Sequence, residues 1–161
     1  MGAYLENDAV ISECGLYRYL LRRTWDAKKP RALLVMLNPS TADARIDDAT
    51  IRSCVRLLTA LQYGSMEVVN LFGFRATDPK ELLTCIDPVG PKNDGIVESA
   101  VGRCDVVVCA WGGFPAADHR PDIFPLIKQH RPAVYCFGKT KNGSPKHPLY
   151  LKTGTPLETY P

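Results

Sequence analysis

Short runs of apolar residues recur along this chain, and each run is followed by a polar or glycine-containing turn. The runs span 33–37, 68–72, 106–110 and 133–137. Apolar runs of this length, bounded by turn residues, are typical of strands that are buried on both faces of a sheet. The pattern therefore predicts four central strands that lead into polar side chains at their carboxyl ends.

Helical periodicity appears between the predicted strands. Apolar residues recur every three to four positions from Ile51 to Leu61, on a helix that Asp47 or Asp48 can cap. Three further helices are predicted after 78–81, over 91–102 and over 121–130. Strands that alternate with helices pair in parallel through right-handed crossovers. The pattern predicts an α/β fold around a central, mostly parallel sheet.

The two ends of the chain depart from this alternation. Residues 8–25 contain β-favouring segments on both sides of Cys14-Gly15, which predicts an N-terminal hairpin at the edge of the sheet or beside it. Residues 139–161 are rich in Lys, Gly, Thr and Pro, and they predict a long loop over the rim of the sheet or beside it. Neither end predicts a second domain.

Size and composition favour a single domain over residues 1–161. With 45% hydrophobic residues the chain can bury one core, and its net charge of +3 permits a nucleic-acid partner without arguing for one. The six cysteines show no close pairs, which predicts reduced thiols, no metal site and a cytoplasmic protein. No apolar stretch approaches the roughly 20 residues of a membrane span, and the N-terminus lacks a signal pattern. No membrane partner and no cofactor are expected, and the oligomeric state stays open.

Polar side chains follow the predicted strands at the edge where an open parallel sheet binds its ligands. Asn38-Pro39-Ser40 follows the first run, and Asn70 lies in the second. Trp111-Gly112 follows the third run, and His147 comes in the loop after the fourth. Because the carboxyl ends of parallel strands share one rim, these residues are expected to meet in one cleft.

Three segments of the chain have highly distinctive sequences. Residues 36–43, 47–52 and 70–79 read MLNPSTAD, DDATIR and NLFGFRATDP. With these motifs the chain resembles, nearly from end to end, a bacterial and phage family known as domain of unknown function 1643. This resemblance by itself implies no activity.

The order of four segments also resembles the uracil-DNA glycosylase superfamily, in particular its mismatch-specific thymine/uracil branch. Residues 36–40 are similar to its first motif, Gly-x-Asn-Pro followed by Gly or Ser, and residues 69–79 are similar to a stretch of the type Thr-Asn-apolar-x-x-Arg-x-Thr-Pro. Trp111-Gly112 resembles a strand that ends in Trp-Gly, and residues 147–149 resemble the closing His-Pro-Ser-Pro-Leu motif. The resemblance implies the superfamily's fold, a three-layer α/β/α sandwich around the mostly parallel sheet, and hydrolysis of the N-glycosidic bond of a modified or deaminated base in DNA.

Cleavage of such a bond develops positive charge on the sugar and negative charge on the departing base, so it needs a positioned water and donors aimed at the base. Asn38 can orient that water, although an amide cannot accept its proton. His147 can donate to the leaving base, and Asn70 can read a Watson–Crick edge. Further candidates for contact with the substrate or its phosphates are Pro39, Ser40, Arg75, Trp111, Gly112, Lys139, Lys141 and Lys146.

Two features keep other functions open. No aromatic residue lies between Asn38 and Tyr63 to stack on a base, and the first motif carries no carboxylate. Asp43, Asp47 or Asp48 is the alternative general base, although an Asp before a helix is first of all an N-cap. The remaining hypotheses are a non-catalytic module that binds a nucleotide or nucleic acid, and an enzyme that acts on a free nucleotide.

Overall fold

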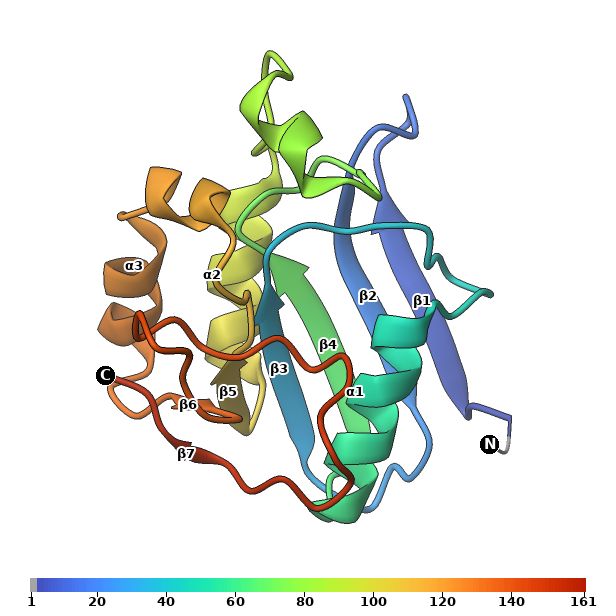
Figure 1. Cartoon of the computed structure of the whole chain (residues 1–161). Coiled ribbons are helices and arrows are strands. Elements are labelled where there is room, and N and C mark those ends of the chain that lie inside the picture. The colour runs from blue at the N-terminus through green and yellow to red at the C-terminus, as the bar shows by residue number, and fades with distance from the viewer. Residues whose placement is uncertain (1–2) are drawn as a thin grey trace.

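The computed structural model describes residues 3–161 and shows an α/β fold around one seven-stranded mixed sheet (Figure 1). The spatial order of the strands is β1-β2-β4-β3-β5-β6-β7. Along the chain these strands are β1 (Glu6–Ile11), β2 (Arg18–Thr24), β3 (Arg31–Met36), β4 (Ser65–Asn70), β5 (Val106–Cys109), β6 (Tyr135–Cys136) and β7 (Glu158–Thr159). The α-helices are α1 (Ala49–Ala60), α2 (Asn93–Arg103) and α3 (Ile123–His130), and 3-10 helices span Pro79–Leu83 and Pro115–His119.

The four strands predicted from the apolar runs form the parallel centre of the sheet. β3 pairs in parallel with β4 on one side and with β5 on the other, and β6 pairs in parallel with β5. The connection after β3 leads to β4, whereas the connection after β5 leads the other way, to β6. In open α/β sheets, ligands bind in the crevice at the carboxyl ends of such a pair of strands.

The predicted N-terminal hairpin extends one edge of the sheet. β2 pairs antiparallel with β4, and β1 pairs antiparallel with β2. Two arginines of β2 are buried, since Arg18 is 3% and Arg23 0% exposed. Arg23 pairs with Asp47 at 2.9 Å between Nε and Oδ1, whereas Arg18 lies at the carboxyl ends of the central strands.

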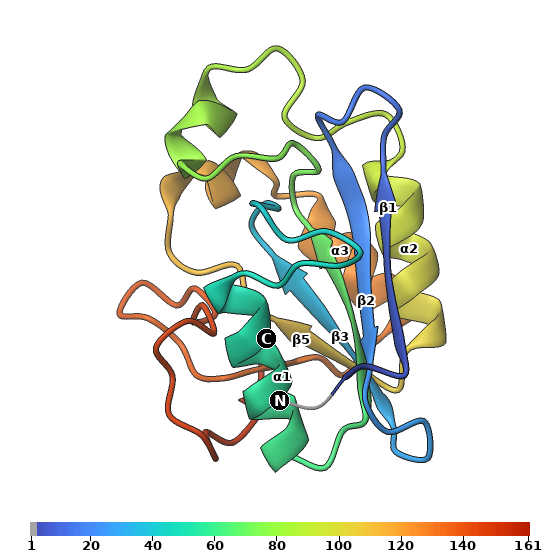
Figure 2. The same ribbon diagram turned by 90° about the vertical axis from the view of Figure 1, so that its right-hand side faces the viewer.

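Helices lie on both faces of the sheet, with α1 on one face and α2 and α3 on the other (Figure 2). The side chains of β3 explain why both faces of the sheet are covered by helices. Leu33 and Val35 join the core beneath α2 and α3, whereas Leu34 and Met36 join the core beneath α1. Because successive side chains of a strand point to opposite faces, a run that is apolar throughout supplies two cores at once.

Capping fixes the start of α1 beside the carboxyl end of β3. Oδ1 of Asp48 accepts a hydrogen bond from the N–H of Ile51 at 2.8 Å. Ile51, Val55 and Leu58 then bury the predicted apolar face of the helix against the sheet. Of the two aspartates predicted as the N-cap, Asp48 takes this role, because Asp47 is engaged by Arg23.

Three predictions of element bounds need correction. The strand predicted over 68–72 is β4, which begins earlier and ends at Asn70. The strand predicted over 133–137 is reduced to β6, because Pro132 has no N–H to donate to a ladder and Gly138, with φ of 101°, turns the chain. The segment 139–161, predicted as a loop, contains β7, which pairs antiparallel with β6 and extends that edge.

All six cysteines are free thiols, and the buried ones are Cys54, Cys104, Cys109 and Cys136. Burial raises the pKa of Cys104 to about 12, so this thiol stays protonated at neutral pH. The buried cysteines therefore act as small apolar residues of the core, as the sequence predicts. None of the helices within residues 3–161 has the length and apolar character needed to span a bilayer.

Candidate functional site

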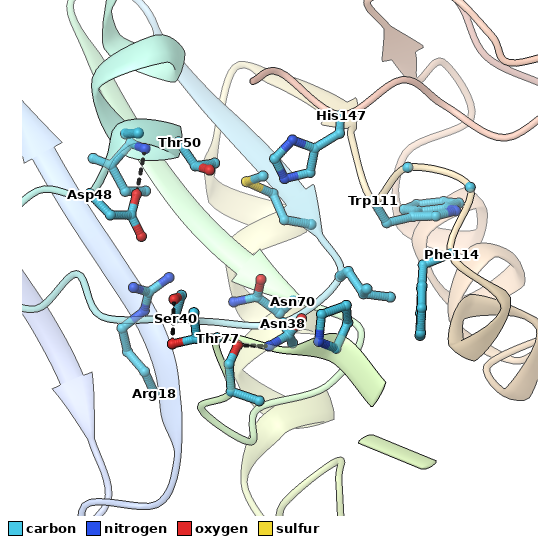
Figure 3. A pocket seen from close by; sticks show the side chains of 18 residues that line it. Arg18, Asn38, Ser40, Asp48, Thr50, Asn70, Thr77, Trp111, Phe114 and His147 are labelled. Carbon is cyan, nitrogen blue, oxygen red and sulfur yellow. Dashed lines mark hydrogen bonds between the residues drawn. The ribbon is translucent and has the colours of Figure 1, made fainter. Parts of the chain in front are cut away.

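A cavity of about 420 Å³ opens at the carboxyl ends of the central strands (Figure 3). Its volume lies in the range of small-molecule sites, about 300–1,000 Å³. The cavity occupies the crevice expected from the opposite connections after β3 and β5. Among the residues predicted from the sequence, those that line it are Asn38, Ser40, Asp48, Asn70, Trp111, Gly112 and His147.

Asn38 lines the cavity directly after β3, and the backbone holds its amide. Nδ2 donates to the carbonyl of Ala76 at 2.8 Å and to the carbonyl of Pro39 at 3.0 Å. These bonds fix the side chain, so Oδ1 is the atom left to accept a hydrogen bond from water or a ligand. Asn38 can therefore orient a water molecule but cannot take up its proton.

Asn70 ends β4 with an amide that is buried and unpartnered. The residue is 1% exposed, and neither Oδ1 nor Nδ2 has a hydrogen-bond partner within residues 3–161. Buried amides are nearly always hydrogen-bonded, because an unpaired polar group costs about 1–3 kcal/mol. The main chain is held here, since Asn93 donates to the Asn70 carbonyl at 2.9 Å and Arg120 donates to the Leu71 carbonyl. The main chain of Asn70 is thus held at the cavity, and its side-chain amide has a donor and an acceptor free (Figure 3).

Arg18 is a cavity residue that sequence reasoning missed. Its guanidinium donates one hydrogen bond, from Nη1 to the Ala42 carbonyl at 2.8 Å, and its Nε has no partner in the described chain. Burial lowers the pKa of Arg18 to about 10, against the opposing charge of Asp48. Arg18 is therefore cationic at neutral pH, and it offers only donors to a ligand. The sequence did not indicate a role for Arg18, because most arginines in strands lie on the surface.

The three aspartates proposed as alternative bases have different surroundings. Asp43 accepts two backbone N–H groups of its own loop, which lower its pKa, and Asp47 forms the ion pair with Arg23. Neither lines the cavity, whereas Asp48 does, with Oδ1 committed to α1 and Oδ2 without a hydrogen bond in residues 3–161. The tertiary structure thus singles out Asp48. In the same residues, no three His, Cys, Asp or Glu side chains gather to form a metal-binding group.

His147 faces the cavity from the loop after β6. Its Nδ1 accepts a hydrogen bond from the Leu149 N–H at 3.2 Å, so the neutral ring carries its proton on Nε2. Burial lowers the pKa of His147, against the opposing charge of Asp48. His147 is therefore a neutral donor near pH 7. Gly112 has φ of 75°, a left-handed backbone conformation that favours glycine, whereas a Cβ there would make only an ordinary contact, 3.4 Å from the Cβ of His147.

The imidazole of His147 is expected to titrate below its ordinary value of 6.5, because burial disfavours the charged ring. NMR of the ring protons between about pH 5 and 8 measures this, with a histidine in an unstructured peptide as the reference. Since the folded pKa lies below the unfolded one, the neutral ring stabilises the fold above pH 6.5, and this stability is lost as the pH falls towards the folded pKa. A midpoint at or above that of an unfolded histidine would contradict the buried neutral ring.

Aromatic side chains reach the cavity from the segment after β5. Trp111 is 9% exposed and packs edge-on against Tyr160, with ring centroids 5.7 Å apart. Phe114 lines the same side of the cavity (Figure 3). The sequence lacks an aromatic residue shortly after Asn38 to stack on a base, and Trp111 and Phe114 bring aromatic rings to the cavity from later in the chain. Sequence reasoning missed Phe114, although an aromatic directly after two glycines at a strand end is a usable signal.

Other predicted contact residues lie outside the cavity lining. Pro39 is buried, and Arg75 donates from Nε to the Ser40 carbonyl at 3.4 Å. Lys139 is exposed on the C-terminal segment, as are Lys141 and Lys146. A role for these cations in phosphate contact outside the cavity stays a prediction. Inside it, Oγ of the predicted Ser40 lies 3.5 Å from Oγ1 of Thr77, a hydroxyl that the sequence did not single out.

Comparison with known proteins gives a family but no relative of established activity. A family model described as "Protein of unknown function (DUF1643)" matches residues 18–149. This range includes every residue that lines the cavity, from Arg18 to His147. No curated protein and no solved structure matches the chain.

Proposed function

The chain belongs to the DUF1643 family, and from its cavity we propose that it binds a nucleobase and hydrolyses the N-glycosidic bond between that base and its sugar. The observation that carries the proposal is the buried, unpartnered amide of Asn70. An amide offers an acceptor and a donor side by side, which complements the donor and acceptor on the edge of a base. A ligand that pairs with this amide recovers the free energy that its burial costs.

Other cavity residues fit a base that carries carbonyl oxygens. Trp111 and Phe114 supply aromatic surface for a planar ring. Arg18 and Nε2 of His147 offer donors only, so the atoms of the ligand that face them have to be acceptors. An amino group of the base at that position would place its N–H donors against the N–H donors of Arg18 and His147. The cavity therefore favours an oxo base, such as a deaminated one, over its amino counterpart.

In the proposed reaction, water attacks the anomeric carbon, and the C–N bond breaks with its electron pair leaving on the base. Oδ1 of Asn38 orients the water, and Oδ2 of Asp48 accepts its proton. The charge of Arg18 and the N–H of His147 stabilise the negative charge on the departing base. The carboxylate absent from the first motif is thus supplied by the N-cap of α1.

The finer fold assignment is part of the same proposal. Helices on both faces of the parallel strands support a three-layer α/β/α sandwich of the uracil-DNA glycosylase type (Figure 2). Asn38, Asn70 and His147 share one cavity, as that resemblance implies.

The proposed hydrolysis is expected to yield abasic product from an oligonucleotide that carries uracil, hypoxanthine or 5-hydroxymethyluracil. Asp48→Asn is expected to slow the reaction by about 10²–10⁴-fold, because it removes the proton acceptor. Asp43→Asn is the matched control, since this carboxylate lies outside the cavity, and it should keep the parent rate. Strand scission after alkali treatment measures the product. Absence of product from all three substrates would refute the hydrolysis.

A second candidate function is binding of a nucleotide or nucleic acid without turnover. The commitment of Asp48 Oδ1 to the N–H of Ile51 favours it, because this bond already accounts for the residue structurally. A rise in melting temperature with nucleosides or oligonucleotides, and no product, would establish this function. Stabilisation by mononucleotides but not by oligonucleotides, together with turnover, would instead indicate an enzyme of free nucleotides.

A further inference from the structure

A groove beside the cavity runs along the outer face of α1. Its volume is about 740 Å³, and we call it the α1 groove. The C-terminal segment after His147 forms its other wall and passes beside α1 in both views (Figures 1 and 2). The residues that matter below are Ala49, Arg52 and Arg56 of α1, with Leu149, Tyr150 and Thr153 of the C-terminal segment.

The α1 groove carries positive charge, and no acidic residue lines it. Arg52 and Arg56 are four residues apart on α1, an arrangement of like charges that destabilises a helix. Arg52 donates to the Asp47 carbonyl at 2.9 Å, and Arg56 donates to the Leu151 carbonyl at 2.8 Å. Neither guanidinium forms an ion pair within residues 3–161. Two adjacent, uncompensated cations attract a polyanion.

Tyr150 lines the α1 groove and is 91% exposed. Its backbone is left-handed, with φ of 69°. Bulky residues seldom adopt this conformation, and such strain concentrates at functional sites. The turn is held in place, because the Leu151 N–H donates to the Pro148 carbonyl at 3.2 Å and Arg56 donates to the Leu151 carbonyl. An exposed aromatic ring on a fixed turn offers a surface on which a base can stack.

The α1 groove adjoins the cavity. Ala49 lines both, and His147 of the cavity precedes Leu149 of the groove by two residues. A polynucleotide with one base in the cavity therefore has its neighbouring nucleotides beside the groove.

We propose that the α1 groove binds a single strand of nucleic acid next to the base that enters the cavity. Tyr150 stacks on a neighbouring base, and Arg52 and Arg56 contact phosphates. A nucleic acid is favoured over an acidic peptide by the exposed ring and by the base-binding cavity alongside, so this choice of partner rests on the proposed function. A single strand is favoured over a duplex because its bases expose the faces that stack. The substrate base then belongs to a polynucleotide.

The test is binding of a labelled oligodeoxyadenylate, which contains no oxo base, to the full-length protein at several NaCl concentrations. Arg52→Gln is expected to make the slope of log K against log[NaCl] shallower by about 0.7, and Arg52→Gln with Arg56→Gln by about 1.4. Tyr150→Ala is expected to weaken binding by about 5- to 100-fold, whereas Tyr150→Phe keeps it because phenylalanine also stacks. Fluorescence anisotropy measures all of these affinities.

The matched control is Lys28→Gln with Lys92→Gln, which removes two exposed charges outside the α1 groove and should leave the slope unchanged. Arg56 also anchors the segment around Leu151, so its replacement can disturb the groove itself. The single variant Arg52→Gln leaves that anchor in place and keeps the test decisive. The proposal is overturned by a parent that does not bind at low salt, by an equal effect of the control, or by a polyglutamate peptide that competes in the same Tyr150-dependent way. Thermal stabilisation by free nucleosides, read on the same preparations, reports on the cavity alone and separates failure of the groove from failure of the proposed function.

Discussion

Replacement of Asn70 by leucine is expected to raise the free energy of unfolding by about 1–3 kcal/mol while it removes ligand binding. The amide is buried without a partner, so leucine removes a group that destabilises the free protein and fills a similar volume. The same change deletes the donor and the acceptor that read the base. Urea denaturation measures the first effect, and ligand-induced thermal stabilisation measures the second.

The same substitution at Asn93 is the matched control. Asn93 is also buried, but its Nδ2 donates to the carbonyls of Asn70 and Leu71, at 2.9 and 3.4 Å. Asn93→Leu is therefore expected to lower the free energy of unfolding by about 1–3 kcal/mol, because it leaves buried carbonyls without this donor. Destabilisation of equal size by Asn70→Leu and Asn93→Leu would show that the Asn70 amide serves the fold and not a ligand.

Replacement of Glu67 by glutamine is expected to lower the free energy of unfolding by about 3 kcal/mol. The carboxylate is 0% exposed and meets three arginines, at 3.0 Å from Arg22, 3.2 Å from Arg31 and 2.6 Å from Arg103. Without its charge, three guanidinium groups from different elements crowd around a neutral side chain. The arginines are partly exposed, which keeps the loss near the lower end for a broken buried ion pair.

The pH dependence of this loss identifies its cause. Burial opposes ionisation of Glu67, but the hydrogen bond and charge of Arg103 outweigh it and hold the pKa below 4.5. Since the folded pKa lies below the unfolded one, the carboxylate stabilises the fold fully above the unfolded pKa and loses this effect as the pH falls through the folded pKa. The difference between parent and Glu67→Gln should therefore stay constant down to about pH 5 and shrink below it.

Glu98→Gln is the control for a lost carboxylate on the surface. Glu98 is half exposed and meets His130 at 2.9 Å, so its replacement is expected to change stability by less than about 1 kcal/mol. Urea denaturation of both variants at neutral pH gives the comparison. Equal losses would mean that the cluster around Glu67 behaves as an ordinary surface ion pair.

Much of the fold could be predicted because local patterns of apolar and polar residues determine it. The apolar runs at 33–37 and 106–110 correspond to β3 and β5, and the spacing from Ile51 to Leu61 corresponds to α1. Burial on both faces follows from unbroken apolar runs, and parallel pairing follows from their alternation with helices. The run at 133–137 predicted β6 but not its shortness, and β7 was missed because a strand of two residues carries too little pattern to be recognised.

The convergence of Asn38, Asn70 and His147 could also be predicted, because each follows or ends an apolar run and the carboxyl ends of parallel strands share one edge. The sequence could not show that Asn70 lacks a partner, since satisfaction of a buried amide depends on atoms far away in the chain. Nor could it choose among Asp43, Asp47 and Asp48, which all lie before α1, because only the tertiary structure shows that Asp48 alone lines the cavity and that Asp47 pairs with Arg23.

The sequence by itself determined the α/β class, the central strands and the rim on which polar side chains gather, because hydrophobic periodicity and chain order act locally. Only the tertiary structure placed Arg18 from the edge hairpin and Phe114 from the segment after β5 in one cavity with Asn70. It alone also set Tyr150 beside Arg52 and Arg56. These groupings depend on long-range packing, which determines whether a charge is paired, an amide is satisfied or a ring is exposed, and no local pattern of residues records that.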